Sequence, residues 1–133
     1  MNYQLLLKEH NLKATPQRLE ILDVIAYYGH ISIESLYENI KNKFSSISLA
    51  TIYKNINAMT KNSLLFEVKL PNEKSVYEIV KEEHSHLLCN SCGTIQDVSI
   101  NLDTIEDDIS KNYQFKISQT DLVVSGVCAK CED

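Results

Sequence analysis

Long hydrophobic runs are missing from this chain of 133 residues. No apolar stretch approaches the roughly 20 residues that a membrane-spanning helix needs, so we expect no membrane partner. The first ten residues contain three consecutive leucines but no signal-peptide architecture. No internal repeat or low-complexity segment occurs either. We therefore expect a cytoplasmic protein, built as one compact unit or as two small modules.

Cysteine is absent outside two short motifs, and its placement is informative. All four cysteines fall into two Cys-x-x-Cys pairs, Cys89/Cys92 and Cys128/Cys131. Disulfides are disfavoured in a reducing compartment, and four thiolates at this spacing fit the closed tetrahedral site of structural Zn(II). The alternatives are a redox-active disulfide, or two pairs that never meet. A zinc site would join the middle of the chain to its end and stabilise the module between them.

Acidic charge is concentrated in the second part of the chain. The net charge is −5, but residues 1–80 have nine Lys and Arg against eight Asp and Glu, a net charge of +1. Residues 81–133 have four Lys against ten Asp and Glu, a net charge of −6. A nucleic-acid surface, if the protein has one, therefore belongs to the first part.

The first 80 residues have the pattern of helices followed by a hairpin. Capping residues and apolar periodicity predict helices over residues 3–10, 16–28, 33–44 and 49–61. Two β-rich runs, 65–70 and 75–80, flank a Pro-Asn-Glu-Lys turn. Such an order predicts a winged helix, a variant of helix-turn-helix. The apolar stripes of the second and fourth helices are predicted to be Leu19, Leu22, Ile25 and Ala26, and Leu49, Ile52, Ile56 and Met59.

The fourth helix has an exposed face suited to DNA. Ser48 caps this helix, and its buried stripe leaves Tyr53, Lys54 and Asn57 on another face. An aromatic hydroxyl, a cation and an amide just past a capped N-terminus suit a helix that enters a major groove. A solvated helix face is the alternative interpretation.

Residues 84–133 have the pattern of a small α/β module, after a charged stretch at residues 81–83 that we expect to be a hinge. If its first segment is extended, His84 and His86 share one face, so both imidazoles can reach one metal. An apolar face too large for the module predicts dimerisation through its sheet. Strands are predicted over residues 87–89, 94–99, 115–118 and 122–127, and a helix capped by Asn101 over residues 102–112.

Four motifs occur in a specific order along nearly the whole chain. They are Ala14-Thr15-Pro16-Gln17-Arg18, Ser48-Leu49-Ala50-Thr51-Ile52-Tyr53-Lys54-Asn55, His84-x-His86-x-x-Cys89-x-x-Cys92-Gly93 and Cys128-x-x-Cys131. Together they resemble the ferric uptake regulator (Fur) family of metal-dependent transcription regulators. The resemblance implies an α+β fold, with an N-terminal winged-helix DNA-binding domain (residues 1–80) followed by a small α/β metal-binding dimerisation domain (residues 84–133).

The resemblance also implies partners and DNA-binding residues. The chain would be a homodimeric repressor on double-stranded DNA, with an AT-rich inverted repeat as its operator. Tyr53 and Lys54 would contact bases or backbone, Lys13 would reach toward the minor groove, and Arg18 would reach toward a phosphate. Ser48 and Thr51, at the start of the same helix, complete the implied DNA-binding set.

A regulatory metal site of five ligands is implied as well. Three imidazoles and two carboxylates suit Fe(II), Mn(II) or Zn(II), so the ligand types alone do not identify the metal. Taken singly, His30 could equally be a capping or surface residue, and Glu78 a solvated strand position. His10, which has no matching partner, is expected at the surface. The implied ligands are His30, Glu78, His84, His86 and Asp97.

Among the branches of the family, the chain is most similar to the peroxide-responsive one (PerR). Asp97 points to this branch, in which bound Fe(II) reacts with hydrogen peroxide, a ligand histidine is oxidised and DNA is released. Ser85 and the segment Gln119-Thr120 lack the Asp and His of a further site found in other branches. Glu78 departs from the Asp that is common in peroxide sensors.

Three alternatives remain at this point. An uptake regulator would sense the level of iron or zinc without peroxide chemistry. A non-haem iron oxygenase or a hydrolase would need an open coordination position facing a substrate pocket, and nothing in the sequence indicates one. A zinc-ribbon interaction module would explain the cysteines but not the histidines. We therefore expect a regulator and not an enzyme.

Overall fold

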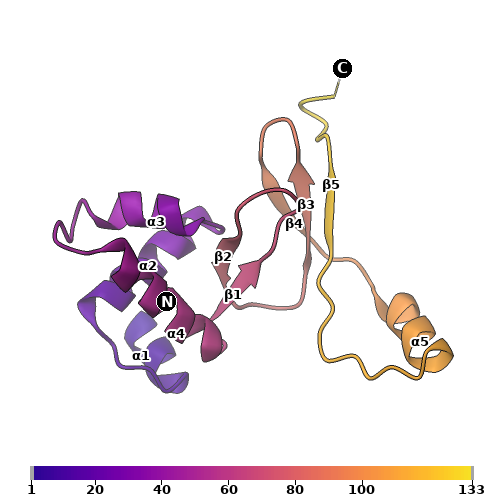
Figure 1. The fold of residues 1–133 in the computed structure, drawn as a ribbon, viewed down its shortest axis with the longest axis horizontal. Coiled ribbons are helices and arrows are strands. Elements are labelled where there is room, and N and C mark those ends of the chain that lie inside the picture. Colours follow the sequence, from indigo (N-terminus) through magenta and orange to yellow (C-terminus); the bar gives the residue numbers. More distant parts are fainter. Residues whose placement is uncertain (1, 133) are drawn as a thin grey trace. The chain divides into compact units, whose positions relative to one another are not determined.

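The computed structural model describes residues 2–132. The chain divides into two compact units, with the boundary between Lys81 and Glu82. The first unit contains four helices and a hairpin, and the second contains a three-stranded sheet and one helix (Figure 1). In chain order the elements are α1 (Tyr3–Glu9), α2 (Pro16–Tyr28), α3 (Ile33–Ile40), α4 (Leu49–Lys61), β1 (Leu65–Val68), β2 (Val76–Ile79), β3 (Ser85–Cys89), β4 (Ile95–Val98), α5 (Asp103–Asn112) and β5 (Val123–Gly126).

The helices of the first unit begin at capping side chains. In each, a side-chain oxygen accepts a hydrogen bond from the backbone N–H three residues further on, which satisfies one of the amides that a helix start leaves unpaired. Gly29 ends α2 with φ at 79°, a conformation that glycine adopts without strain. The four caps are Asn2, Thr15, Ser32 and Ser48.

The core of the first unit confirms most of the predicted apolar stripes and corrects two positions. Ala26 is exposed, and Ile21 is buried in its place, because the buried face of α2 is rotated by about one residue. Leu49 is also exposed, since it is the first residue of α4. α3 ends at Ile40, four residues earlier than predicted. The core side chains with no exposed surface are Leu7, Ile21, Leu22, Ile25, Ile40, Ile52, Ile56 and Met59.

The hairpin β1–β2 forms the predicted wing. Its strands pair antiparallel, with Phe66 opposite Glu78. Ile31, just before α3, bridges to Tyr77 of β2 through two backbone hydrogen bonds of 3.2 and 2.8 Å. The bridge fixes the segment before α3 along the wing, and so places His30 beside Glu78.

The second unit is organised around β3. This strand pairs antiparallel with β4 and parallel with β5, and the sheet order is β4-β3-β5. α5 lies in the connection that a parallel pairing requires, and it stands apart from the sheet (Figure 1). The Asn101 side chain accepts a hydrogen bond from Asp103 N at 2.8 Å, although the N-cap position itself is Leu102.

The predicted strand over residues 115–118 is wrong. This segment is irregular, and Phe115 is largely exposed. Gln114 directly before it has φ of 50°, which turns the backbone away from an extended course. Both edges of β3 are already paired, so the segment has no place beside the central strand.

Within residues 2–132, the structure contains no helix with the length and apolarity that a membrane crossing requires.

Two leucines on α1 provide a stability test with a built-in control. Leu7 is fully buried and Leu5 is 53% exposed. We expect Leu7→Ala to lower the free energy of unfolding by about 2–5 kcal/mol, because it leaves a cavity in the core. Leu5→Ala should change it by no more than about 0.5 kcal/mol. Urea denaturation followed by circular dichroism measures both, and equal effects of the two substitutions would contradict the assigned core.

Candidate metal sites and DNA-binding surface

The four cysteines come together in the second unit. All four are free thiols, and their sulfur atoms lie within 4.8 Å of one another. The register explains the meeting, because parallel pairing sets Cys89 at the end of β3 opposite Gly126, two residues before Cys128. The Sγ atoms of Cys92 and Cys128 are 3.8 Å apart, far longer than a disulfide bond of about 2.05 Å. Four sulfurs at about 2.3 Å from a tetrahedral zinc ion would be about 3.8 Å apart, so the group fits zinc.

Hydrogen bonds prepare this group for a cation. Backbone N–H groups of Cys128 and Cys92 each donate to Cys89 Sγ at 3.4 Å and lower the pKa of the Cys89 thiol to about 6. At Cys131, the hydrogen bond with Ser91 lowers the pKa, but the neighbouring thiols outweigh it and raise the pKa to about 11. The group therefore gives up its first proton readily and resists losing the last one, and a dication would offset this repulsion.

A second group of ligand atoms lies at the start of β3. His86 is directly opposite Asp97 of β4, and its Nε2 is 3.5 Å from Asp97 Oδ1. His84 Nε2 is 3.6 Å from the same oxygen, and the two imidazole rings are 4.6 Å apart. These separations exceed a hydrogen bond but match two ligands that share one ion at about 2.1 Å from each. The two imidazoles thus lie on one face of the second unit, as predicted.

The tautomer of His84 suits a ligand role. Its Nδ1 lies 2.8 Å from the carbonyl oxygen of Glu82, which can only accept, so Nδ1 carries the proton. In a neutral ring with this tautomer, Nε2 has the lone pair that a metal ligand needs, and Nε2 is the atom that faces Asp97. Fixing one ring nitrogen with a carbonyl is the usual way in which proteins orient a metal-binding histidine. The Glu82 carbonyl could not be identified from the sequence, because any residue provides one.

The remaining two implied ligands pair within the first unit. His30 Nε2 is 2.9 Å from Glu78 Oε2. The Glu78 side chain is only 2% exposed, which argues against the solvated strand position considered from the sequence. A buried carboxylate is costly unless it is paired with a positive partner such as an imidazolium or a metal ion.

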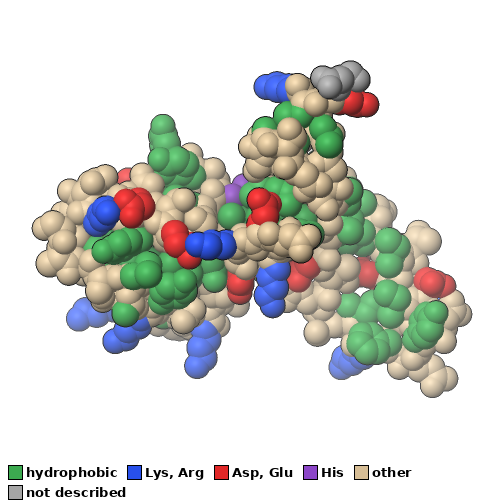
Figure 2. All heavy atoms as spheres, turned by 45° about the horizontal axis from the view of Figure 1, so that its top comes forward, with side chains coloured by type: hydrophobic (Ala, Val, Ile, Leu, Met, Phe, Trp, Pro, Cys, Tyr) green, Lys and Arg blue, Asp and Glu red, His purple; other side chains and the backbone are tan. Residues whose placement is uncertain are grey.

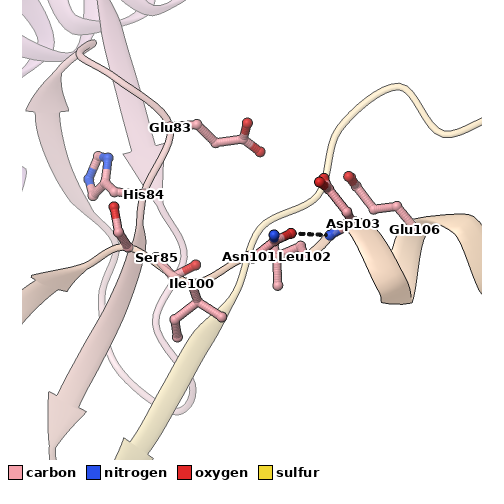
Figure 3. A pocket seen from close by; sticks show the side chains of 9 residues that line it. Glu83, His84, Ser85, Ile100, Asn101, Leu102, Asp103 and Glu106 are labelled. Atoms are coloured by element: carbon pink, nitrogen blue, oxygen red, sulfur yellow. Dashed lines mark hydrogen bonds between the residues drawn. The ribbon is translucent and has the colours of Figure 1, made fainter.

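A hollow of about 400 Å³ lies beside β3 in the second unit. Glu83, Asp103 and Glu106 bring carboxylates to it, and Ser85 also lines it (Figure 3). Thr120 Oγ1 donates to Glu106 Oε2 at 2.5 Å. The hydroxyl of Ser85 thus stands where the resemblance would place the Asp of a further metal site, and the segment Gln119-Thr120 lacks the His. Exposed acidic groups are common in proteins that hold no ion there, and we assign this hollow no ligand.

The surface of α4 presents the residues predicted to contact DNA. Tyr53, Lys54 and Asn57 are exposed, and Lys13 is exposed on the segment before α2. Positively charged side chains project from the surface of the first unit (Figure 2).

Three polar residues of the first unit are more buried than the sequence indicated or make hydrogen bonds that it did not predict. Asn55, which sequence analysis did not single out, is buried in α4, and the only signal for it was an amide beside the apolar stripe. It accepts a hydrogen bond from Arg18, which is half-buried. His10 is half-buried, not at the surface, with Nδ1 2.9 Å from the Asn62 carbonyl oxygen.

A winged helix with an exposed capped helix, joined to a sheet with two ligand groups of different chemistry, defines a class: metal-dependent transcription regulators. Residues 9–125 match the Ferric uptake regulator family. The chain belongs to this family, which confirms the resemblance drawn from its four motifs.

Individual relatives agree with this assignment. The chain is 32% identical over 127 residues to the Peroxide operon regulator of Bacillus subtilis, covering 94% of this chain and 88% of that protein. It is similar to the crystal structure of the Campylobacter jejuni peroxide stress regulator, with 37% identity, a TM-score of 0.74 and coverage of 98% and 100% of the two chains. The Vibrio cholerae ferric uptake regulator has 29% identity, a TM-score of 0.78 and coverage of 96% and 100%.

Removal of one sulfur ligand tests the zinc site. We expect Cys128→Ser to lose about one zinc ion per chain and to loosen the second unit, because metal binding supplies folding free energy there. The first unit, which has its own core, should stay folded. Atomic absorption gives the zinc content, and hydrogen exchange followed by mass spectrometry gives the protection of each unit. Ser125→Ala on β5 is the control, and full zinc content with unchanged protection in Cys128→Ser would contradict the assignment.

Proposed function

We propose that this chain is a dimeric, metal-activated transcription repressor that releases its DNA operator on exposure to peroxide. The observation that carries the proposal is the presence of two different ligand groups at the two ends of β3. The four thiols suit a fixed structural Zn(II) ion. The imidazole and carboxylate group suits an exchangeable Fe(II) or Mn(II) ion.

The regulatory ion would have five ligands, drawn from both units. His84, His86 and Asp97 supply three, which is fewer than the five or six that Fe(II) and Mn(II) commonly take. His30 and Glu78 supply the other two, and the hinge at residues 81–83 allows both groups to bind the same ion. Such an ion favours one arrangement of the two units only through its greater affinity for that arrangement.

Bound Fe(II) would supply the redox catalysis for the reaction of hydrogen peroxide with a ligand histidine, with no net loss of electrons from the ion. One oxygen atom of the peroxide enters a ring C–H bond of His30 or His84, the imidazole loses two electrons, and the other oxygen leaves as water. The neutral tautomer of His84, fixed by the Glu82 carbonyl, presents its Nε2 to the ion. An oxidised ring is a poorer ligand, so the arrangement that binds DNA loses its stabilisation.

DNA contact is assigned to α4 and to the segment before α2. We propose that α4 enters the major groove, where Tyr53 and Lys54 contact bases or backbone, and that Lys13 reaches the minor groove. Ser48 and Thr51 hold the N-terminus of α4 through a hydrogen bond of 2.9 Å between their hydroxyls. A regulator of this kind works beside its DNA, in the cytoplasm.

A second copy of the chain is the proposed partner of the second unit. Hydrophobic side chains gather on the surface around α5 (Figure 2). A surface of this kind favours association, and a twofold dimer requires an operator with two inverted half-sites. We propose an AT-rich sequence for them. The exposed large hydrophobic residues of the second unit are Ile100, Ile105, Tyr113, Phe115, Val124 and Val127.

A second candidate is an uptake regulator that senses only the metal level. Glu78 favours it, because peroxide sensors commonly have Asp at this position. The Glu78 carboxylate is buried beside His30, and we propose that it still binds the metal despite this departure. The two candidates differ only in the response of the iron-loaded protein to peroxide.

The decisive experiment compares metals and oxidant. We expect Mn(II) and Fe(II) each to tighten binding to a duplex that the metal-loaded protein selects from a random-sequence pool. Hydrogen peroxide should reverse this tightening with iron but not with manganese, since only Fe(II) would catalyse the oxidation of a ligand histidine by peroxide. Fluorescence anisotropy measures binding, and mass spectrometry should find one added oxygen on the peptides of His30 or His84. Persistent DNA binding by the oxidised iron form, without added oxygen, would reject the peroxide proposal and leave the metal sensor.

Substitutions on α4 separate a regulator from an enzyme or an adaptor. Lys54→Ala should weaken DNA binding and reduce the slope of log affinity against log salt by about 1, because one phosphate or base contact is lost. Lys61→Ala, at the opposite end of α4, is the matched control. Anisotropy titrations at several salt concentrations give both slopes, and identical behaviour of the two variants would show that α4 does not contact DNA through its N-terminal half.

A further inference from the structure

One side chain joins three segments of the DNA-binding unit. Arg18 lies in the first turn of α2. Its Nε donates to Asn55 Oδ1 of α4 at 3.0 Å, and its Nη1 donates to the backbone carbonyl of Lys13 at 3.1 Å. The guanidinium therefore connects the segment before α2 with the helix assigned to the major groove. Two of its donor atoms, Nε and Nη1, are engaged by these bonds within one planar group.

Asn55 is suited to the receiving end of this connection. Its side chain is buried, and its Nδ2 donates to the Thr51 carbonyl at 3.0 Å within α4. The opposite amide orientation would set an NH2 group against the guanidinium, donor against donor, so the bonds define the orientation. A buried amide with both ends bonded is costly to disturb, because removal of one partner leaves the other unpaired.

We propose that Arg18 is a positioning residue, which with Asn55 holds the Lys13 segment in register with α4. This inference rests on the proposed DNA binding and refines it. Lys13 and α4 are assigned to different grooves, so both can contact DNA only if their spacing is fixed. Arg18 fixes the distance between the Lys13 segment and α4 already in the free protein. Its positive charge near a phosphate contributes less to the DNA affinity.

The two roles predict opposite results for a conservative change. Lysine keeps the charge of Arg18 but cannot bond Asn55 and the Lys13 carbonyl together with a planar fork. A residue that served mainly as a cation for phosphate would tolerate Arg18→Lys and would be indifferent to Asn55→Ala. A positioning residue is sensitive to both, and the effects of the two changes overlap because they break the same connection.

The test uses the full Mn(II)-loaded chain and the duplex that the wild type selects from a random-sequence pool. We expect Arg18→Lys and Asn55→Ala each to weaken binding to this duplex about tenfold. The double variant should also lose about tenfold in affinity relative to the wild type, and no more. Binding to a scrambled duplex, and the salt slope, should stay unchanged, because no cation is removed. Wild-type affinity in Arg18→Lys, or additive losses in the double variant, would overturn the proposal.

Asn39→Ala is the matched control. Asn39 makes the same bond to the carbonyl four residues before it, Ser35 O at 2.8 Å, but on α3 and without an arginine. It should bind DNA as the wild type does. Thermal unfolding checks each variant, and if Asn55→Ala does not fold, Arg18→Lys alone decides.

A readout without DNA separates this inference from the proposed function. Hydrogen exchange of the free protein should become faster at the backbone amides of residues 11–14 in Arg18→Lys but not in Asn39→Ala. If the wild type selects no duplex, the DNA-binding proposal fails while this exchange result still judges the connection. Unchanged exchange in Arg18→Lys would reject the connection itself.

Discussion

The parallel pairing of β3 with β5 is the constraint on which the second unit depends. It sets Cys89 opposite Gly126 and so brings together two cysteine pairs that are far apart in sequence. Within the described residues, the buried hydrophobic side chains of this unit are only Leu88 and Cys89. A unit of about 50 residues with so small a core needs a metal or a partner to be stable. The cysteine group is suited to a metal, and the apolar surface around α5 is where we propose the partner.

The same strand carries both metal chemistries because its two ends have different neighbours. At one end, the turn after Cys89 directs two backbone N–H groups at a sulfur and favours the thiolate. At the other end, the antiparallel register places Asp97 opposite His86. Of the ligand residues, His86 and Cys89 lie on β3 itself, and Asp97 lies on the strand paired with it. The two ligand groups therefore occupy separate ends of this strand.

Sequence reasoning succeeded where the signal is local and failed where a partner decides. Ser48, Thr15 and the Cys-x-x-Cys spacing act within a few residues, and the helix starts and the cysteine group followed from them. The strand predicted around Phe115 failed because an extended segment needs a free strand edge, and the sheet order is not written in the segment itself. The role of Asn55 was not predicted for a related reason: it depends on a hydrogen bond from Arg18, which is 37 residues away in the sequence.

The first unit owes its stability to its own hydrophobic core. The first unit has a continuous core that includes residues of all four helices and the wing, so its fold does not depend on a metal ion. The regulatory ion that we propose would then change the orientation of this unit without unfolding it. The free energy available for regulation is the difference in the affinity of the ion for two arrangements, and no more than that. Such a difference can act on DNA only if the contact residues are already fixed within the first unit, which is the task that the Arg18–Asn55 connection performs.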